Sequence, residues 1–200
     1  VEGLDADYEA IAQHCADVLE QVEEAEEVRV TSPAGTDITF ETAGREWHED
    51  TGMVREAGSF SNLPAGEVFV APESADGTFV VDGTMMPHGL LADDQELRFE
   101  VEDGHVTHIS DEAVREDVEQ ASTEVGTAAT NVAELGIGTN VGVTELVGSV
   151  LLDEKAAGTV HIAIGDNASI GGEIEAPIHL DGILRAPTVY ADGEAITLPE

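Results

Sequence analysis

Residues 159–164 read Thr-Val-His-Ile-Ala-Ile, and residues 178–181 read Ile-His-Leu-Asp. Both stretches alternate between two kinds of side chain, which predicts strands that turn one face toward a core. In the first strand, His161 points away from the aliphatic residues on either side of it. In the second, His179 and Asp181 share the face opposite the aliphatic pair. The two strands therefore predict a sheet with one apolar face and with imidazole and carboxylate groups on the other.

The neighbouring segments predict more strands and a few helices. Strands are expected at residues 28–31, 37–41, 67–71, 78–81, 97–102, 106–110, 159–164 and 178–184, with a last hairpin around residues 191–193. Helices are expected at residues 5–27, 111–125 and 143–152, the first capped by Asp5 or Asp7 and the second by Asp111. Residues 47–60 are predicted to be irregular, and residues 131–142 form a glycine-rich stretch. The sequence thus predicts an α+β fold: a strand-rich domain with a mixed or antiparallel sheet, or a barrel-like arrangement, and two to three helices.

The charge balance is the strongest signal in the composition. Asp and Glu number 43 against 7 Lys and Arg, which gives a formal net charge of −36. Such an anionic surface repels phosphate backbones and acidic lipids, so neither nucleic acid nor a membrane is an expected partner. The hydrophobic fraction of 42% is that of a folded protein, and the acids therefore indicate adaptation to very high salt. The expected location is the cytoplasm of a salt-accumulating, halophilic microbe.

Length and cysteine content fit the same interpretation. A chain of 200 residues can form one domain with its own core, and residues 1–200 are expected to be a single domain. Its apolar runs are too short to span a membrane. The single cysteine, Cys15, allows no internal disulfide, which agrees with the cytoplasm. It lies on the apolar stripe of the first predicted helix, where a core residue is expected rather than a nucleophile.

Two further acids stand apart from the acidic clusters. Glu67 lies in NLPAGEVFVAP (residues 62–72) and Glu134 in NVAELGIGTN (residues 131–140), both among apolar residues and glycines. A carboxylate carried into a core has to be paired or bound to a metal. With the two strand motifs, these acids complete a candidate set of metal ligands: Glu67, Glu134, His161, His179 and Asp181. The alternative is a set of ordinary polar core residues in a binding or structural protein.

Several segments resemble, in the same order along the chain, motifs of the aminopeptidase T-like metallopeptidases, a family of thermophilic metallopeptidases and leucyl aminopeptidases. They are residues 62–72, AELGIGTN at 133–140, DEKAAGTVHIAIGDN at 153–167 and HLD at 179–181. The resemblance runs from about Gly3 onward and corresponds to the C-terminal two-thirds of a full-length family member. It implies that an N-terminal lobe is absent from this chain and that the protein is a homodimer.

The resemblance implies a two-metal aminopeptidase. The ligands of that family match Glu67, Glu134, His161, His179 and Asp181, and the ions would be two zinc, cobalt or manganese ions. A metal-activated water would attack the peptide carbonyl next to a free N-terminus, so the implied substrate is a peptide. Glu154, within the matching segment 153–167, would be an acid that orients a ligand. From the residues alone, Glu154 belongs to a charge cluster at the end of a helix.

One departure from the aminopeptidase motif points to a second branch. The aminopeptidases carry a tyrosine a few residues after the histidine of this strand, whereas residues 165–172 read GDNASIGG. The stretch is similar to the related dihydroxypyridine ring-cleaving dioxygenases, which implies one Fe(II) and a small-molecule substrate. Its ligands would be His161, His179 and Asp181, and Glu67 and Glu134 would then lie near the substrate.

Overall fold

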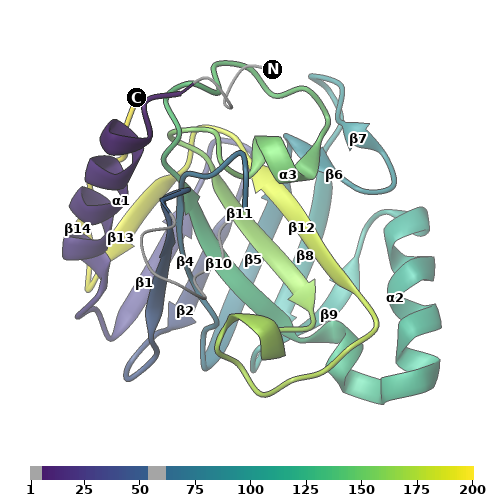
Figure 1. Ribbon diagram of the computed structural model, residues 1–200. Coiled ribbons are helices and arrows are strands. Elements are labelled where there is room, and N and C mark those ends of the chain that lie inside the picture. The colour runs from purple at the N-terminus through teal and green to yellow at the C-terminus, as the bar shows by residue number, and fades with distance from the viewer. Residues whose placement is uncertain (1–5, 54–61) are drawn as a thin grey trace.

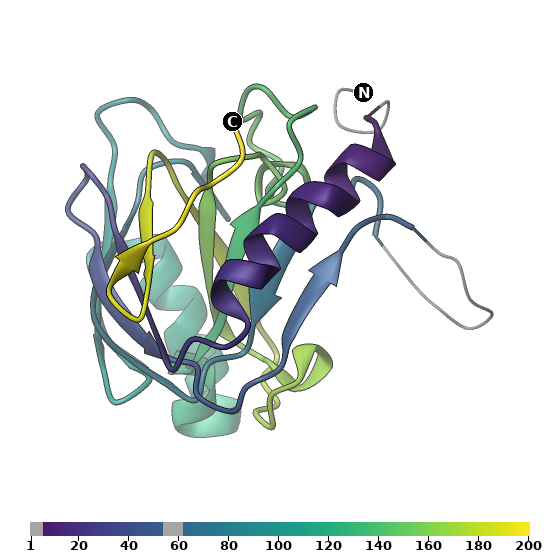
Figure 2. The ribbon, with the colours of Figure 1, turned by 90° about the vertical axis from the view of Figure 1, so that its left-hand side faces the viewer.

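Two seven-stranded antiparallel sheets pack face to face and make up most of the protein (Figures 1 and 2). The computed structural model describes residues 6–53 and 62–200. Three α-helices lie around the sheets, so the predicted α+β fold is confirmed. In the part of the chain described, no helix is long and apolar enough to cross a membrane.

The first sheet has the strand order β14-β13-β1-β2-β5-β8-β9. Its strands are β1 (Glu27–Thr31), β2 (Asp37–Glu41), β5 (Ser74–Val81), β8 (Leu97–Glu102), β9 (His105–Ile109), β13 (Thr188–Ala191) and β14 (Glu194–Ala195). The strands predicted at 28–31 and 37–41 and at 97–102 and 106–110 pair as the hairpins β1–β2 and β8–β9, and the predicted last hairpin, β13–β14, is confirmed. Along β8, buried and exposed residues alternate strictly, because one face meets the core and the other meets solvent.

The second sheet has the order β3-β4-β10-β11-β12-β6-β7. Its strands are β3 (Trp47–Asp50), β4 (Glu67–Val70), β6 (Thr84–Met85), β7 (Gly89–Leu90), β10 (Val132–Gly138), β11 (Val160–Gly165) and β12 (His179–Leu184). All residues of β10 and β11 are buried, so both faces of this sheet are covered at its centre.

The core lies between the two sheets. The first sheet contributes the stacked pair Phe79 and Phe99, whose ring centroids are 4.4 Å apart. The second contributes aliphatic residues such as Val68, Leu135 and Ile162, all fully buried. These aliphatic side chains occupy the inward positions of β4, β10 and β11, which leaves the alternate positions of the same strands on the outer face.

The first helix, α1 (Tyr8–Val22), packs against β3 and β4. Asp7 caps it, as predicted, and accepts hydrogen bonds from the backbone N–H groups of Glu9 and Ala10; Asp5 lies outside the described residues. The helix ends five residues before the predicted Glu27. Its end is rich in glutamate and has no basic residue in the last turn, so the partial negative charge of the helix C-terminus meets further negative charge.

The second helix, α2 (Glu112–Val125), lies beside β9 and begins as predicted, with Asp111 accepting from the backbone N–H of Val114. The 3₁₀ helix η1 (Gly126–Thr130) then leads into β10. The third helix, α3 (Val150–Asp153), has only four residues, so the predicted helix at 143–152 is wrong over most of its length. The Asp153 carboxylate accepts from the backbone N–H groups of Val147 and Gly148, and these bonds hold the segment before α3 as a loop.

Three other expectations need correction. Residues 47–50 form β3 rather than irregular chain, whereas the rest of the segment to residue 60 lies largely outside the described residues. Strand β5 starts at Ser74, four residues before the strand predicted at 78–81. The glycine-rich stretch contains β10, an inner strand of its sheet. Glycine is a poor strand former, and the glycines of β10 leave room for neighbouring groups rather than form a turn.

Candidate metal centre

The outer face of the second sheet gathers the candidate ligands. In the register of the strands, Glu134 of β10 lies opposite Ala163 of β11, which in turn lies opposite Asp181 of β12. His161 of β11 lies opposite Gly136 of β10. The predicted alternation is therefore confirmed: imidazole and carboxylate groups share the face that points away from the aliphatic core.

Gly136 provides the space in which the His161 ring lies. A Cβ atom built on Gly136 would come within 2.0 Å of Nε2 of His161, a distance at which the ring would have to move. A Cβ atom built on Gly138, two positions further along β10, would likewise lie 2.0 Å from the carbonyl oxygen of Ala156. The glycines of this segment thus allow the close approach of neighbouring groups.

Glu134 lies at the centre of the cluster. Its Oε1 is 3.3 Å from Nε2 of His161, and its Oε2 is 3.2 Å from Nε2 of His179. The same nitrogen of His179 lies 3.4 Å from Oδ1 of Asp181. One carboxylate therefore joins the two histidines, which come from different strands.

Two overlapping groups of potential ligand atoms result among the described residues. In each group all ligand atoms lie within 4.8 Å of one another. One group is Glu67, Glu134 and His161; the other is Glu134, His179 and Asp181. Glu134 belongs to both, so the structure brings all five sequence-predicted ligands into one continuous cluster and places Glu134 between its halves.

A backbone carbonyl orients His179 for metal binding. Its Nδ1 lies 2.7 Å from the carbonyl oxygen of Asp166, the residue just after β11. With Nδ1–H donating to that carbonyl, Nε2 is the nitrogen left to face Glu134 and Asp181. Histidines that bind metals are commonly oriented by such a bond from their other ring nitrogen.

The sequence reasoning missed the part played by Lys155. Its ammonium group is almost fully buried and donates to Oε1 of Glu67 and, at 2.8 Å, to Oε1 of Glu154. Glu154 thus lies beside the cluster as predicted, and it reaches Glu67 through the lysine. A signal was present: Lys155 is the one lysine of a chain with 43 acidic residues, and it directly follows Glu154.

The cluster shifts the pKa values of its two glutamates in opposite directions. Burial raises the pKa of Glu67 to about 7, against the opposing charges of Lys155 and His161. Burial also acts to raise the pKa of Glu134, but hydrogen bonds from His161 and His179 outweigh it and lower that pKa to about 2.

Both imidazoles favour the charged form. Burial acts to lower the pKa of His161, but the hydrogen bond with Glu134 outweighs it and raises the pKa to about 9. For His179, hydrogen bonds with Asp181 and Glu134 likewise outweigh burial and raise the pKa to about 11. A divalent cation bound between these groups would balance the carboxylate charge in place of the protons on the His161 and His179 rings, and it would displace those protons.

The residues fit a divalent metal on two further observations. Among the described groups, Oε2 of Glu67 is buried without a hydrogen-bond partner, although it lies 3.5 Å from Nε2 of His161. A buried carboxylate oxygen without a partner is costly, and a cation removes that cost. Imidazole nitrogen and carboxylate oxygen also form the donor set that first-row divalent metals prefer.

A cavity of about 430 Å³ opens over the cluster. All the sequence-predicted site residues contribute to its lining: Glu67, Glu134, Glu154, His161, His179 and Asp181. Val150 and Leu151 of α3 line another side. The buried carboxylate of Asp153 accepts from the Thr84 hydroxyl at 2.6 Å, which ties α3 to β6 and fixes this wall of the cavity.

Comparison with known sequences gives one family. The sequence profile of the family described as 2,5-dihydroxypyridine 5,6-dioxygenase (NicX) matches residues 6–198. A 2,5-dihydroxypyridine 5,6-dioxygenase of Pseudomonas putida is 25% identical over an alignment of 193 residues, and the match covers 88% of this chain and 54% of that protein. The chain thus spans about half the length of this relative.

Solved structures share the fold. The 2,5-dihydroxypyridine dioxygenase from Pseudomonas putida KT2440 superimposes with a TM-score of 0.81 and 22% identity, over 96% of this chain and 59% of the other. AmpT from Thermus thermophilus gives a TM-score of 0.71 and 20% identity, over 97% of this chain and 57% of the other. At these identities the likeness shows the fold alone.

Proposed function

The chain belongs to the 2,5-dihydroxypyridine 5,6-dioxygenase family, and from this we propose that it holds one ferrous ion and takes part in the oxygen-dependent opening of a dihydroxylated pyridine ring. The observation that carries the proposal is the family match across residues 6–198. The cluster around Glu134 supports it, because the Glu134 carboxylate lies 3.3 Å from Nε2 of His161 and 3.2 Å from Nε2 of His179. Of the two activities expected from the sequence, the dioxygenase is now preferred to the aminopeptidase.

The proposed iron ligands are His161, His179 and Asp181, as the resemblance implies, with Glu134 between them. Bound ferrous iron would supply the redox chemistry that allows a closed-shell ring to react with O₂. The residues of the chain orient the ligands and the substrate. His179 is held by the Asp166 carbonyl, Glu67 and Glu134 face the ring hydroxyls, and Lys155 fixes the Glu67 carboxylate.

A two-metal hydrolase is the second candidate, and a specific observation favours it. The two overlapping ligand groups share Glu134, which is the arrangement expected when one carboxylate lies between two ions. Metal content separates the candidates. One iron per chain supports the dioxygenase, whereas two zinc, cobalt or manganese ions per chain support the hydrolase.

Oxygen uptake provides the direct test of the proposed function. Protein loaded anaerobically with Fe(II) in multimolar salt is mixed with 2,5-dihydroxypyridine, and O₂ consumption and loss of the ring absorbance are followed together. We expect uptake that His179→Ala and Asp181→Asn abolish. His108→Ala, a change at an exposed histidine of β9 in the other sheet, is the control and should leave uptake unchanged.

Two results would contradict the proposal. One is the absence of oxygen uptake in protein that carries a full complement of iron. The other is release of amino acids from peptides, by protein with two ions per chain, at a rate that His179→Ala abolishes. Analytical ultracentrifugation of the same preparations in multimolar salt gives the oligomeric state, for which a homodimer remains the expectation.

A further inference from the structure

The cavity over the metal centre has a polar floor and two apolar walls. The floor is formed by the five candidate ligands on the outer face of the second sheet. Val150 and Leu151 form the first wall, the α3 wall. Phe69 of β4 and Ile170 of the 3₁₀ helix η2 (Ala168–Ile170) form the second, the η2 wall. Helix α3 precedes β11 and η2 follows it, so the two walls stand at opposite ends of this strand (Figure 1).

The α3 wall presents an exposed leucine to the cavity. Leu151 is 50% exposed, and among the exposed large hydrophobic residues in the described part of the chain it is the one that lines this cavity. Its neighbour Leu152 is buried in a small cluster with Val143 and Ala156. Helix α3 therefore turns one leucine inward and the other toward the cavity, where a ligand can remove its apolar area from water.

Hydrogen bonds fix the α3 wall from both sides of Leu151. The Asp153 carboxylate accepts from the hydroxyl of Thr84 on β6 at 2.6 Å. It also accepts from the backbone N–H groups of Val147 and Gly148, at 2.9 and 2.8 Å. Leu151 lies between these anchored points of the chain. The wall is thus already ordered in the empty cavity, and a ligand does not have to order it on binding.

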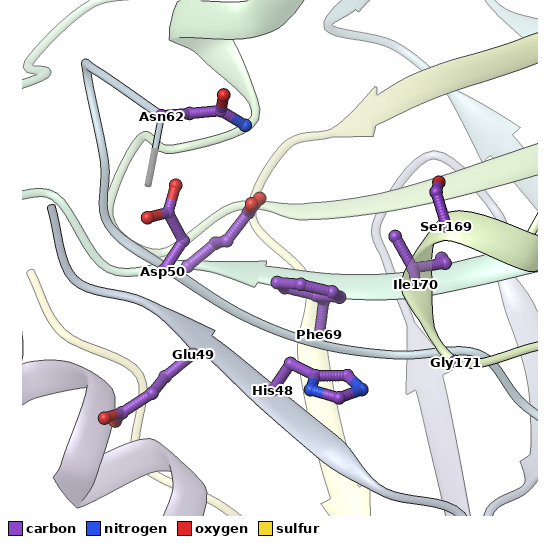
Figure 3. A pocket seen from close by; sticks show the side chains of 9 residues that line it. His48, Glu49, Asp50, Asn62, Phe69, Ser169, Ile170 and Gly171 are labelled. Carbon is purple, nitrogen blue, oxygen red and sulfur yellow. The ribbon is translucent and has the colours of Figure 1, made fainter. Parts of the chain in front are cut away.

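The η2 wall is fixed by one guanidinium group. The Phe69 ring and the Ile170 side chain border the same space (Figure 3). Arg45 donates from Nε to the carbonyl oxygen of Ala71, just after β4, at 2.7 Å. A terminal nitrogen of Arg45 donates to the carbonyl oxygen of Gly171, just after η2, at 3.0 Å. The strand that carries Phe69 and the turn that carries Ile170 are therefore tied to each other.

A flat heteroaromatic ring divides its surface in the same way as this cavity. Its two faces are apolar, whereas its edge carries the nitrogen and the hydroxyl oxygens. When the edge meets the polar floor, the faces turn toward the walls. A peptide instead carries N–H and C=O groups along its whole length, and those that faced the apolar walls would lose their hydrogen-bond partners.

We propose that Leu151 and Ile170 are specificity-determining residues that contact the two faces of the reacting ring, which stands with its edge on the metal centre. Leu151 contacts one face, and Ile170, with Phe69 beside it, contacts the other. The inference rests on the proposed function for the identity of the ring. It deepens that function, because it assigns the preference for a planar aromatic substrate to the two walls.

Anaerobic calorimetry tests the walls apart from the oxidation. 2,5-Dihydroxypyridine is titrated into iron-loaded protein in multimolar salt, without oxygen and at several temperatures, which gives both Kd and the heat-capacity change of binding. Leu151→Asn and Ile170→Asn, which replace an apolar side chain by a polar one, should each raise Kd at least roughly fivefold. Both should also make the heat-capacity change less negative, because less apolar area is buried on binding.

Matched variants separate apolar contact from other effects. Leu151→Met keeps the apolar area and should leave Kd within about twofold of the unaltered protein. Val147→Asn is the control, since Val147 lies in the same segment, is 57% exposed and does not line the cavity. It should change neither Kd nor the heat-capacity change. Iron content and the circular dichroism spectrum are recorded for every variant, and weaker binding that follows only from lost iron would overturn the role of the walls.

The outcomes separate this proposal from the proposed function. Unchanged Kd values in both asparagine variants, with normal uptake when oxygen is admitted, would overturn the walls alone. So would a higher Kd with an unchanged heat-capacity change, because it would show that the ring buries no apolar area there. The expected rise in Kd, without oxygen uptake by the unaltered protein, would support the walls and count against the dioxygenase. No ring binding by fully iron-loaded protein would overturn both.

Discussion

The two sheets have the same number of strands and the same antiparallel pairing, yet they use their outer faces in opposite ways. In the first sheet, β8 alternates between buried and exposed residues, and its outer positions carry Arg98, Glu100 and Glu102. In the second, β10 and β11 are buried throughout, and their outer positions carry glycine, glutamate and histidine. An outer face that is polar yet buried has to satisfy its charges internally, which is what a metal centre does.

The ion pairs of the two sheets differ in the same way. Arg29 and Asp37 in the first sheet pair at 2.7 Å with about half of each side chain exposed. Lys155 and Glu67 in the second are almost completely buried. An exposed ion pair adds little to stability, because each charge is also well solvated by water. A buried ion pair is different, because removal of one partner leaves the other charge without solvation. The two sheets should therefore respond differently to salt and to the loss of a charged partner.

Lowering the salt concentration should have the largest effect, and it should act on the first sheet before the second. The net charge of −36 is screened within about 3 Å at 1 M salt but only within about 10 Å at 0.1 M, so repulsion between exposed acids grows on dilution. We expect amide protons of β2 and β8 to lose protection from exchange at a higher salt concentration than those of β10 and β11. Equal loss in both sheets, or a circular dichroism spectrum unchanged in low salt, would contradict this.

Replacement of Lys155 should cost the most stability of any single change considered. Lys155→Met leaves the buried carboxylates of Glu67 and Glu154 without their cation, which costs about 3–5 kcal/mol in the free energy of unfolding. Denaturant titration in multimolar salt measures it. Arg29→Met, which removes the exposed cation of the first sheet, is the comparison and should change the midpoint very little. Similar losses for both variants would show that burial does not distinguish the two pairs.

Replacement of Gly136 should remove metal binding with a smaller loss of stability. In Gly136→Ala the new Cβ displaces the His161 ring, and we expect metal affinity to fall at least roughly 100-fold. A chelator should therefore lower the Tm of the unaltered protein, which loses about 2.7 kcal/mol if metal was present at about 100 times its Kd. The same chelator should leave the Tm of the variant unchanged.

The control for that experiment is Gly193→Ala. Gly193 has a φ of +86° and open space around its Cβ position, so alanine there costs stability through the backbone alone. This variant should keep both its metal and its response to the chelator. A Gly136→Ala protein that binds metal normally would show that the ring of His161 can move without consequence.

A rise in pH to about 10 should produce the smallest effect, at the place where α1 meets the second sheet. Burial raises the pKa of the Cys15 thiol to about 12, from 9.0 in an exposed chain. The unfolded state therefore loses its proton first, and stability that is complete below pH 9 falls as the pH rises from about 9 to 12. By about pH 10 the loss should reach about 1.4 kcal/mol. Cys15→Ala, titrated with denaturant over the same range, should lack this part of the decline.

The sequence was sufficient for the hairpins and for the start of each long helix. Alternation in residues 97–110 and the caps Asp7 and Asp111 are local signals, and they predicted local structure correctly. It was also sufficient to gather the five candidate ligands. The facing of the two histidines and Asp181 along their strands is a local property, and so is the position of Glu67 and Glu134 among apolar residues. Whether those residues bind metal remains a prediction.

The failures share a different cause. Strand β10 was not recognised because Gly136 and Gly138 are poor strand formers. The groups that need the space, the His161 ring and the Ala156 carbonyl, lie 25 and 18 positions later in the chain. The helix expected at 143–152 is reduced to four residues because the side chain of Asp153 takes the backbone N–H groups of the loop. Likewise, the partner of Lys155 lies 88 residues away. Contacts over such separations are decided by the tertiary structure and have no local pattern.

The close approach of His161 to Gly136 also limits the order in which this site can arise by single substitutions. With any larger residue at 136, a histidine at 161 has no room for its ring, because even a single methyl group would lie 2.0 Å from Nε2. Glycine has to be in place first, at a time when it only weakens the strand and brings no benefit. A protein with this fold and alanine at position 136 therefore needs two substitutions to acquire the site, first glycine at 136 and then histidine at 161. The first of them lowers stability.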